Sequence, residues 1–136
     1  MKTQDILKSH PRKPNLETRD VTNCIEACRE CLVVCTSCAD ACLGEQNIQM
    51  LVGCIRLDLD CADVCETTAK ILIRQTETNM QLLRSQLETT VTASRLCAEE
   101  CEKHAEMHQH CRICASACRN CEQMCRQLLS GLKNIK

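Results

Sequence analysis

The sequence predicts an all-α protein, an antiparallel up-down-up-down four-helix bundle with a cysteine-lined interior. Between residues 24 and 42, six cysteines recur at alternating steps of four and three residues, and their mean step of 3.6 residues is one turn of an α-helix. Three later segments place cysteine and apolar residues at the same spacing. Short turns separate the segments, and four amphipathic helices joined in this way are typical of an antiparallel bundle.

Residues 1–13 are predicted to form a short helical or loose N-terminal arm. Pro11 and Pro14 fall at its end, and no proline occurs in the rest of the chain. Because proline lacks the N–H donor that a helix interior requires, these two residues separate the arm from the first long helix. The bundle is therefore expected to occupy residues 14–136 as one domain.

The first bundle helix carries the cysteine stripe and is predicted at about residues 16–43. Asn15 is a candidate cap for its N-terminus, and Gly44 suits the left-handed conformation that often comes after a helix. Three later periodic faces predict three more helices, at about residues 47–75, 78–105 and 110–131.

The placement of sulfur along the helices supports the antiparallel arrangement. Cysteines occupy the first half of the second predicted helix and the second half of the third, so antiparallel packing brings the two halves to one level. The opposite level collects Leu72, Leu83, Leu87 and Leu128. We therefore expect an apolar plug at one end and a thiol-lined interior towards the other, where the 1–2 and 3–4 turns lie.

The composition narrows the class of protein. The chain has 136 residues, a net charge of −1 and no Phe, Tyr or Trp, and the charge gives no sign of nucleic-acid binding. No segment suits a membrane span and the N-terminus lacks an export signal, so we expect a cytoplasmic protein with no membrane partner. Cysteines in that compartment are kept reduced, which favours metal over disulfides. No nucleophile–base set, nucleotide loop or open metal site is readable, and we expect no enzymatic activity.

Sixteen cysteines are too many for simple packing, although free cysteine does pack as a small hydrophobe. Disulfides need Cα atoms within about 7 Å, whereas facing helix axes lie about 8–10 Å apart, so only a few pairs could close. The spacings Cys28-x-x-Cys31 and Cys35-x-x-Cys38 suggest an iron–sulfur site. Ferredoxin cysteines lie in loops, however, and these lie on a helix.

The net charge that would be buried with the thiolates distinguishes Zn²⁺ from Cu(I). Four thiolates make a structural Zn²⁺ site, but sixteen thiolates with four Zn²⁺ ions would bury a net charge of −8, at a cost on the order of several kcal/mol or more. One Cu(I) per thiolate leaves a neutral interior, and soft thiolate ligands favour Cu(I). A general soft-metal or zinc buffer is the alternative, and a redox-controlled interaction protein is a third class.

On these residues the chain resembles the bacterial copper storage proteins, four-helix bundles whose interiors carry repeated Cys-x-x-x-Cys pairs. The resemblance covers roughly residues 16–130 and implies storage of many Cu(I) ions, about one per cysteine, in a cytosolic homotetramer. A copper chaperone or a chelating recipient is the partner that such a store implies. The pairs are Cys24/Cys28, Cys31/Cys35, Cys38/Cys42, Cys61/Cys65, Cys97/Cys101, Cys114/Cys118 and Cys121/Cys125, and Cys54 and Cys111 complete the predicted thiol ligands.

Three histidines and a methionine gather where the thiol-lined interior is expected to open. Extending the third helix beyond its last cysteine reaches His104 and His108, and Met107 and His110 lie beside them. We predict that these residues contact metal at a mouth, because imidazole is a common metal ligand. Met50 begins the second helix at the same end and is assigned to the same rim.

Asp58 lies on the inward arc of the second helix, between two cysteines. It is either a boundary carboxylate paired with a basic neighbour, which is the slightly favoured interpretation, or a metal-binding group that draws cations inward. The sequence leaves both open.

Overall fold

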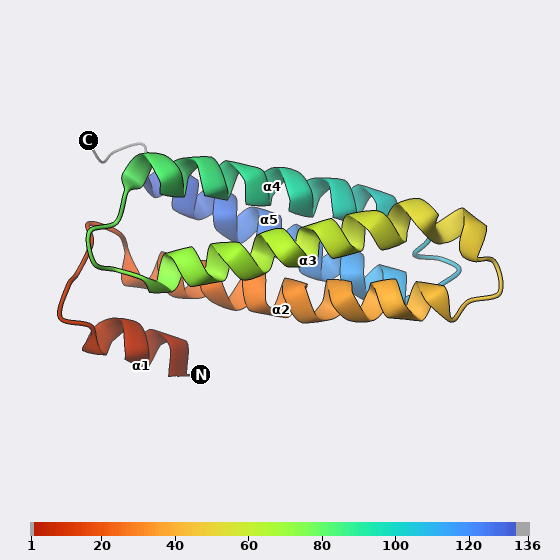
Figure 1. Ribbon diagram of the computed structural model, residues 1–136, viewed down its shortest axis with the longest axis horizontal. Coiled ribbons are helices and arrows are strands. Elements are labelled where there is room, and N and C mark those ends of the chain that lie inside the picture. The colour runs from red at the N-terminus through yellow and green to blue at the C-terminus, as the bar shows by residue number, and fades with distance from the viewer. Residues whose placement is uncertain (1, 133–136) are drawn as a thin grey trace.

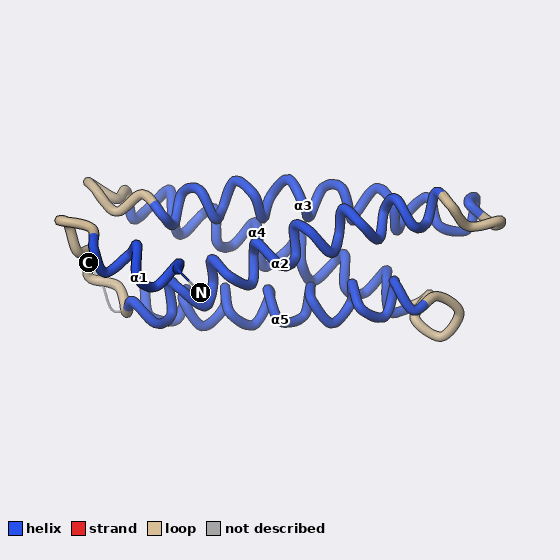
Figure 2. Tube along the Cα trace, turned by 90° about the horizontal axis from the view of Figure 1, so that it is seen from below, coloured by secondary structure: helices blue, strands red, loops and turns tan. Residues whose placement is uncertain are grey.

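The computed structural model describes residues 2–132, and the four long helices in this part of the chain form an antiparallel bundle (Figure 1). They are α2 (Thr18–Leu43), α3 (Val52–Ile73), α4 (Met80–Glu102) and α5 (Gln109–Leu132). Each packs against two neighbours, in the order α2–α3–α4–α5 and back to α2. Seen from below, the helices run side by side with loops only at the two ends (Figure 2). The predicted all-α, up-down-up-down fold is confirmed.

The interior of the bundle is divided along its length. All sixteen cysteines are buried, none with more than 1% of its surface exposed. Leucines from three helices fill the end where the α3–α4 connection lies, and Leu83, Leu87 and Leu128 are each at most 1% exposed. No helix among residues 2–132 is long and apolar enough to cross a bilayer.

The helix ends differ from expectation in detail. Asn15 does not cap α2, because the helix begins later, with Glu17 at the cap position and no side-chain capping bond. Gly44 comes after α2 in a right-handed conformation with φ of −85°, and its N–H donates to the carbonyl oxygens of Asp40 and Ala41. It therefore does not use the left-handed region that was expected.

The connections at the mouth end are longer than predicted. A 3-10 turn, η1 (Ile48–Leu51), precedes α3, and α4 ends at Glu102 rather than near residue 105. The segment between α4 and α5 thus holds His104 in a turn instead of on the predicted helix, and His108 lies directly before α5. The predicted bundle range, 14–136, includes residues 133–136, which lie outside the described residues, as does residue 1 of the arm.

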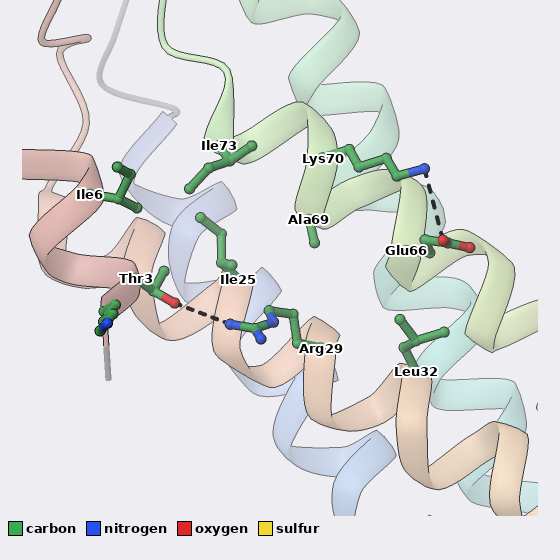
Figure 3. A pocket seen from close by; sticks show the side chains of 10 residues that line it. Thr3, Ile6, Ile25, Arg29, Leu32, Glu66, Ala69, Lys70 and Ile73 are labelled. Atoms are coloured by element: carbon green, nitrogen blue, oxygen red, sulfur yellow. Dashed lines mark hydrogen bonds and ion pairs between the residues drawn. The ribbon is translucent and has the colours of Figure 1, made fainter. Parts of the chain in front are cut away.

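The arm is a helix that packs on the bundle. Within α1 (Lys2–Ser9), Leu7 is only 2% exposed, and its carbonyl oxygen accepts hydrogen bonds from Lys13 Nζ at 3.2 Å and Gln75 Nε2 at 3.1 Å. Arg29 Nη1 of α2 donates to Thr3 Oγ1 at 3.4 Å (Figure 3). A groove of about 560 Å³ lies here between α1, α2 and α3, and no cysteine lines it. It is therefore separate from the thiols.

Candidate metal centre

The sulfur row results directly from the helix period. Steps of three and four residues keep successive cysteines on one face of each helix, and charged residues other than Asp58 lie on the faces away from the interior. The row draws six cysteines from α2, three from α3, two from α4 and five from α5. Every one is a free thiol. The interior is therefore lined with thiols and not cross-linked by disulfides.

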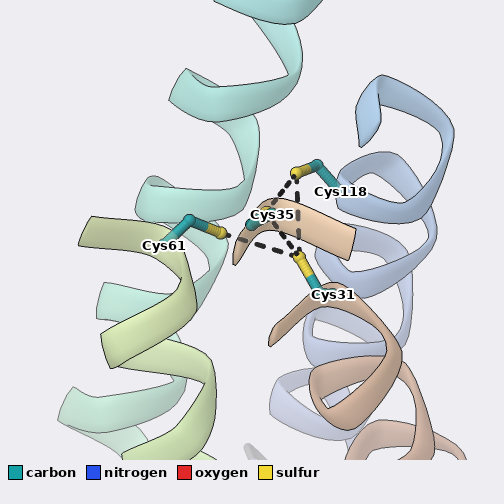
Figure 4. Close-up of side chains that lie close together, drawn as sticks. All are labelled: Cys31, Cys35, Cys61 and Cys118. Atoms are coloured by element: carbon teal, nitrogen blue, oxygen red, sulfur yellow. Dashed lines mark hydrogen bonds between the residues drawn. The ribbon is translucent and has the colours of Figure 1, made fainter. Parts of the chain in front are cut away.

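Neighbouring helices bring their sulfur atoms within contact distance. Cys31 Sγ lies 3.7 Å from the Sγ atoms of both Cys61 and Cys118, and Cys35 Sγ lies 3.5 Å from Cys118 Sγ. Figure 4 shows these four thiols, from α2, α3 and α5, pointing towards one another. Their sulfur atoms all lie within 4.8 Å of one another, and the group could hold a metal ion.

Five such four-residue groups form one continuous series. Each shares two members with the next, so the groups overlap and are not independent sites. A thiolate that belongs to two groups must bridge ions or leave one group incomplete. From the mouth inward the groups are Cys38/Cys42/Cys54/Cys111, Cys38/Cys54/Asp58/Cys101, Asp58/Cys97/Cys101/Cys114, Cys35/Cys97/Cys114/Cys118 and Cys31/Cys35/Cys61/Cys118.

The row continues towards the apolar plug. Cys28 Sγ and Cys65 Sγ each lie 3.8 Å from Cys121 Sγ. Beyond them, Cys24 Sγ lies 3.1 Å from Cys125 Sγ. All sixteen predicted thiol ligands thus belong to one sulfur-lined interior.

Two buried threonines stand where the thiols of α3 and α4 end. Thr68 Oγ1 and Thr90 Oγ1 are 2.7 Å apart, Thr68 Oγ1 donates to the carbonyl oxygen of Val64, and Gln86 Nε2 donates to Thr68 Oγ1. These hydroxyls are fully engaged with protein, and hydroxyl oxygen is a harder ligand than thiolate. The soft-ligand row therefore stops at this level on two of the four helices.

Asp58 is a member of the row and not a boundary carboxylate. Its side chain has no exposed surface, and its Oδ1 accepts from the thiols of Cys97 at 3.0 Å, Cys114 at 3.1 Å and Cys101 at 3.6 Å. The favoured expectation of a basic partner is wrong, because the helix turns Asp58 fully inward among thiols. Burial, which removes water from around the carboxylate, raises the pKa of Asp58 to about 8.

Burial also keeps the protons on two thiols near the mouth, those of Cys42 and Cys111. It raises the pKa of Cys42 to about 11 and raises the pKa of Cys111 above its ordinary value. Desolvation disfavours the charged thiolate, so these groups are neutral and pack as small apolar side chains near pH 7. A metal ion that binds them must release protons.

The three predicted histidines do meet at one end of the bundle, where carboxylates orient them. Glu45 Oε2 lies 3.0 Å from His108 Nδ1 and 2.9 Å from His110 Nε2, and the His110 contact lowers the pKa of Glu45. His104 Nε2 lies 3.2 Å from Glu100 Oε2. The sequence analysis missed both carboxylates. The one signal that could have found them is that both lie near the predicted turns at this end of the bundle.

One histidine joins the rim to the thiols. His110 Nδ1 lies 3.4 Å from Cys38 Sγ and 3.6 Å from Cys111 Sγ. Met50 and Met107, which are 64% and 78% exposed, line a rim cavity of about 450 Å³ without reaching the sulfur row. The imidazole of His110 is therefore the group at the rim that contacts the row directly.

Comparison with known proteins agrees with this geometry. The family model described as copper storage protein matches residues 17–130. The structure of the copper storage protein Ccsp from Streptomyces lividans, loaded with 10 copper equivalents, is 45% identical, covers 95% of this chain and 98% of its own, and superposes with a TM-score of 0.93.

Two further solved structures agree. A cytosolic copper storage protein from Streptomyces lividans with five coppers is 48% identical, with 82% of this chain and 93% of that chain covered and a TM-score of 0.82. The Cu(I)-bound copper storage protein BsCsp3 is 38% identical, with 77% and 93% covered and a TM-score of 0.69. A match of this extent to a family model, together with the shared fold and buried thiols, shows that the chain belongs to the copper storage protein family.

Proposed function

We propose that this chain stores Cu(I) inside its four-helix bundle, with the sixteen cysteines as the principal ligands. The continuous series of overlapping thiol groups carries the proposal. Cu(I) is soft and singly charged, so one ion per thiolate restores neutrality in an interior that cannot hold net charge cheaply. Asp58, which accepts hydrogen bonds from three thiols, is the additional oxygen ligand within the row.

The rim serves exchange. Packed helix walls and the leucine plug leave the histidine end as the route for ions. Imidazole and thioether bind Cu(I) less tightly than thiolate does, so they can catch an ion and pass it inward without trapping it. We assign this role to His104, His108 and His110, with the exposed Met50 and Met107 as outer contacts.

Location, exchange partners and assembly are inferred for this chain from its membership of the family. We infer that it acts in the cytoplasm, exchanges copper with a chaperone or a chelating recipient, and assembles as a homotetramer. The Streptomyces lividans relative, a cytosolic copper storage protein, supports the location. We infer no catalytic role, because binding and transfer of copper account for both the thiols and the histidines.

A zinc buffer is the competing function, because the four-thiol groups also suit Zn²⁺. Metal analysis of protein purified from copper-fed and from zinc-fed cells separates the two. We expect many copper ions per chain after copper feeding and little zinc after zinc feeding. Zinc at about four ions per chain, retained when copper is available, would contradict copper storage. Thiol counts that rise after reductant would instead favour a redox-controlled interaction protein.

A further inference from the structure

A single carboxylate oxygen at the rim contacts two imidazoles. Glu45 lies in the connection after α2, and its Oε2 is 3.0 Å from His108 Nδ1 and 2.9 Å from His110 Nε2. The two rings are stacked, with their centroids 5.4 Å apart. An ionised carboxylate can only accept hydrogen bonds, so both contacting nitrogens carry the proton.

These contacts decide which nitrogen of each neutral ring keeps its lone pair. In His110 it is Nδ1, the atom that lies 3.4 Å from Cys38 Sγ and 3.6 Å from Cys111 Sγ. In His108 it is Nε2, and His108 lines the rim cavity together with Met50. The Glu45 side chain thus leaves His110 with a ligand nitrogen on the side of the thiols and leaves His108 with a ligand nitrogen at the rim cavity.

We propose that Glu45 is a positioning residue for Cu(I) uptake, which selects the tautomers of His108 and His110 so that an ion can pass from the rim to Cys38 and Cys111. Carboxylates that hold the far nitrogen of a metal-binding histidine fix its orientation and increase its basicity. Glu45 performs this task for two rings at once. The inference deepens the proposed function and rests on it.

The variant Glu45→Gln tests the proposal, because an amide both donates and accepts and no longer dictates which imidazole nitrogen is protonated. The matched control is Glu106→Gln. Glu106 is exposed in the turn between α4 and α5, at the same end of the bundle, so its variant removes an equal charge from that end. The carboxylates that contact the rim imidazoles are Glu45 and Glu100 instead. Thermal unfolding of both reduced, metal-free variants should match the parent.

Two measurements are combined. Stopped-flow transfer of Cu(I) from a chelator complex should be about tenfold slower in Glu45→Gln than in the parent and in Glu106→Gln, with equal final copper content in all three. Nitrogen-15 NMR of the reduced, metal-free parent should show His110 Nδ1 without a proton, and Glu45→Gln should show a mixture of tautomers.

Equal uptake rates in the two variants, or a protonated His110 Nδ1 in the neutral ring of the parent, would overturn the role of Glu45. A parent that takes up no Cu(I) from the chelator would overturn the proposed function instead. The NMR result judges the tautomer independently of copper, so the two failures are distinguishable.

Discussion

Asp58 Oδ1 lies 3.0 Å from Cys97 Sγ, within the row of buried thiols. Asp58 is fully buried, and this burial raises its pKa from 3.8 to about 8. Between these two pH values the folded protein keeps a proton that the unfolded chain has lost. Stability of the metal-free protein should therefore fall as the pH rises from about 4 to about 8.

Replacing Asp58 by Asn should remove this pH dependence. The parent is expected to lose at most on the order of 5 kcal/mol of unfolding free energy across the window, and Asp58→Asn should lose much less. Urea unfolding of the reduced, metal-free proteins at several pH values measures the difference. Asp60→Asn is the control, because the Asp60 side chain is 49% exposed and paired with Arg56. Parallel curves for the parent and Asp58→Asn would show that Asp58 is not the titrating group.

The reduced protein should already be a helical bundle without metal. Protonated buried thiols pack as small apolar groups alongside the buried leucines, so the helices can pack against one another without a metal ion. Zinc fingers behave in the opposite way and fold only with their metal. Circular dichroism of metal-free protein under reductant tests this, with strong helical signal expected and a random-coil spectrum as the contrary result.

The periodicity of the sequence predicted the features that follow from which face of each helix is buried, namely the positions of the cysteines and the arrangement of the helices. The cysteines that share a face are buried. The antiparallel packing of α3 against α4, which was predicted to bring their cysteines to one level, is confirmed by Cys54 and Cys101, whose Sγ atoms lie 3.4 Å apart. The ends of helices were less predictable. Asn15 is chemically a good cap, but α2 begins two residues beyond Leu16, and the choice depends on how the chain approaches from α1.

Contacts that depend on tertiary structure could not be derived from the pattern. Glu45 and His110 are 65 residues apart, and only the closing of two connections at one end brings them together. Asp58 lies on the same inward side of its helix as Leu57. Because burying a carboxylate is costly, the sequence favoured a boundary position and a basic partner for Asp58, and this prediction was wrong. Its neighbouring thiols supply the hydrogen bonds that a basic residue was expected to supply.

The histidine rim should control the rate of exchange more than the amount stored. Replacing His104, His108 and His110 together by alanine removes the imidazoles between solvent and the first four-thiol group, at Cys38 and Cys111. Cu(I) uptake and its removal by a chelator should both slow by about tenfold or more, while the final copper content stays nearly the same.

The far end of the row provides the matched control for this experiment. Cys24 and Cys28 lie on the side of the leucine plug, so Cys24→Ala with Cys28→Ala should reduce the copper content and leave the initial rate close to that of the parent. If the histidine variant kept the parent rates and the cysteine variant changed them, the mouth would lie at the opposite end of the bundle.

Titration of the reduced, metal-free protein with Cu(I) against a competing chelator tests copper storage in the thiol row most directly. The number of ions retained per chain distinguishes a neutral row of thiolates from separate four-ligand sites. We predict saturation near one Cu(I) per cysteine, on the order of sixteen per chain, with a few more at the rim. Saturation at about four ions per chain would contradict the account.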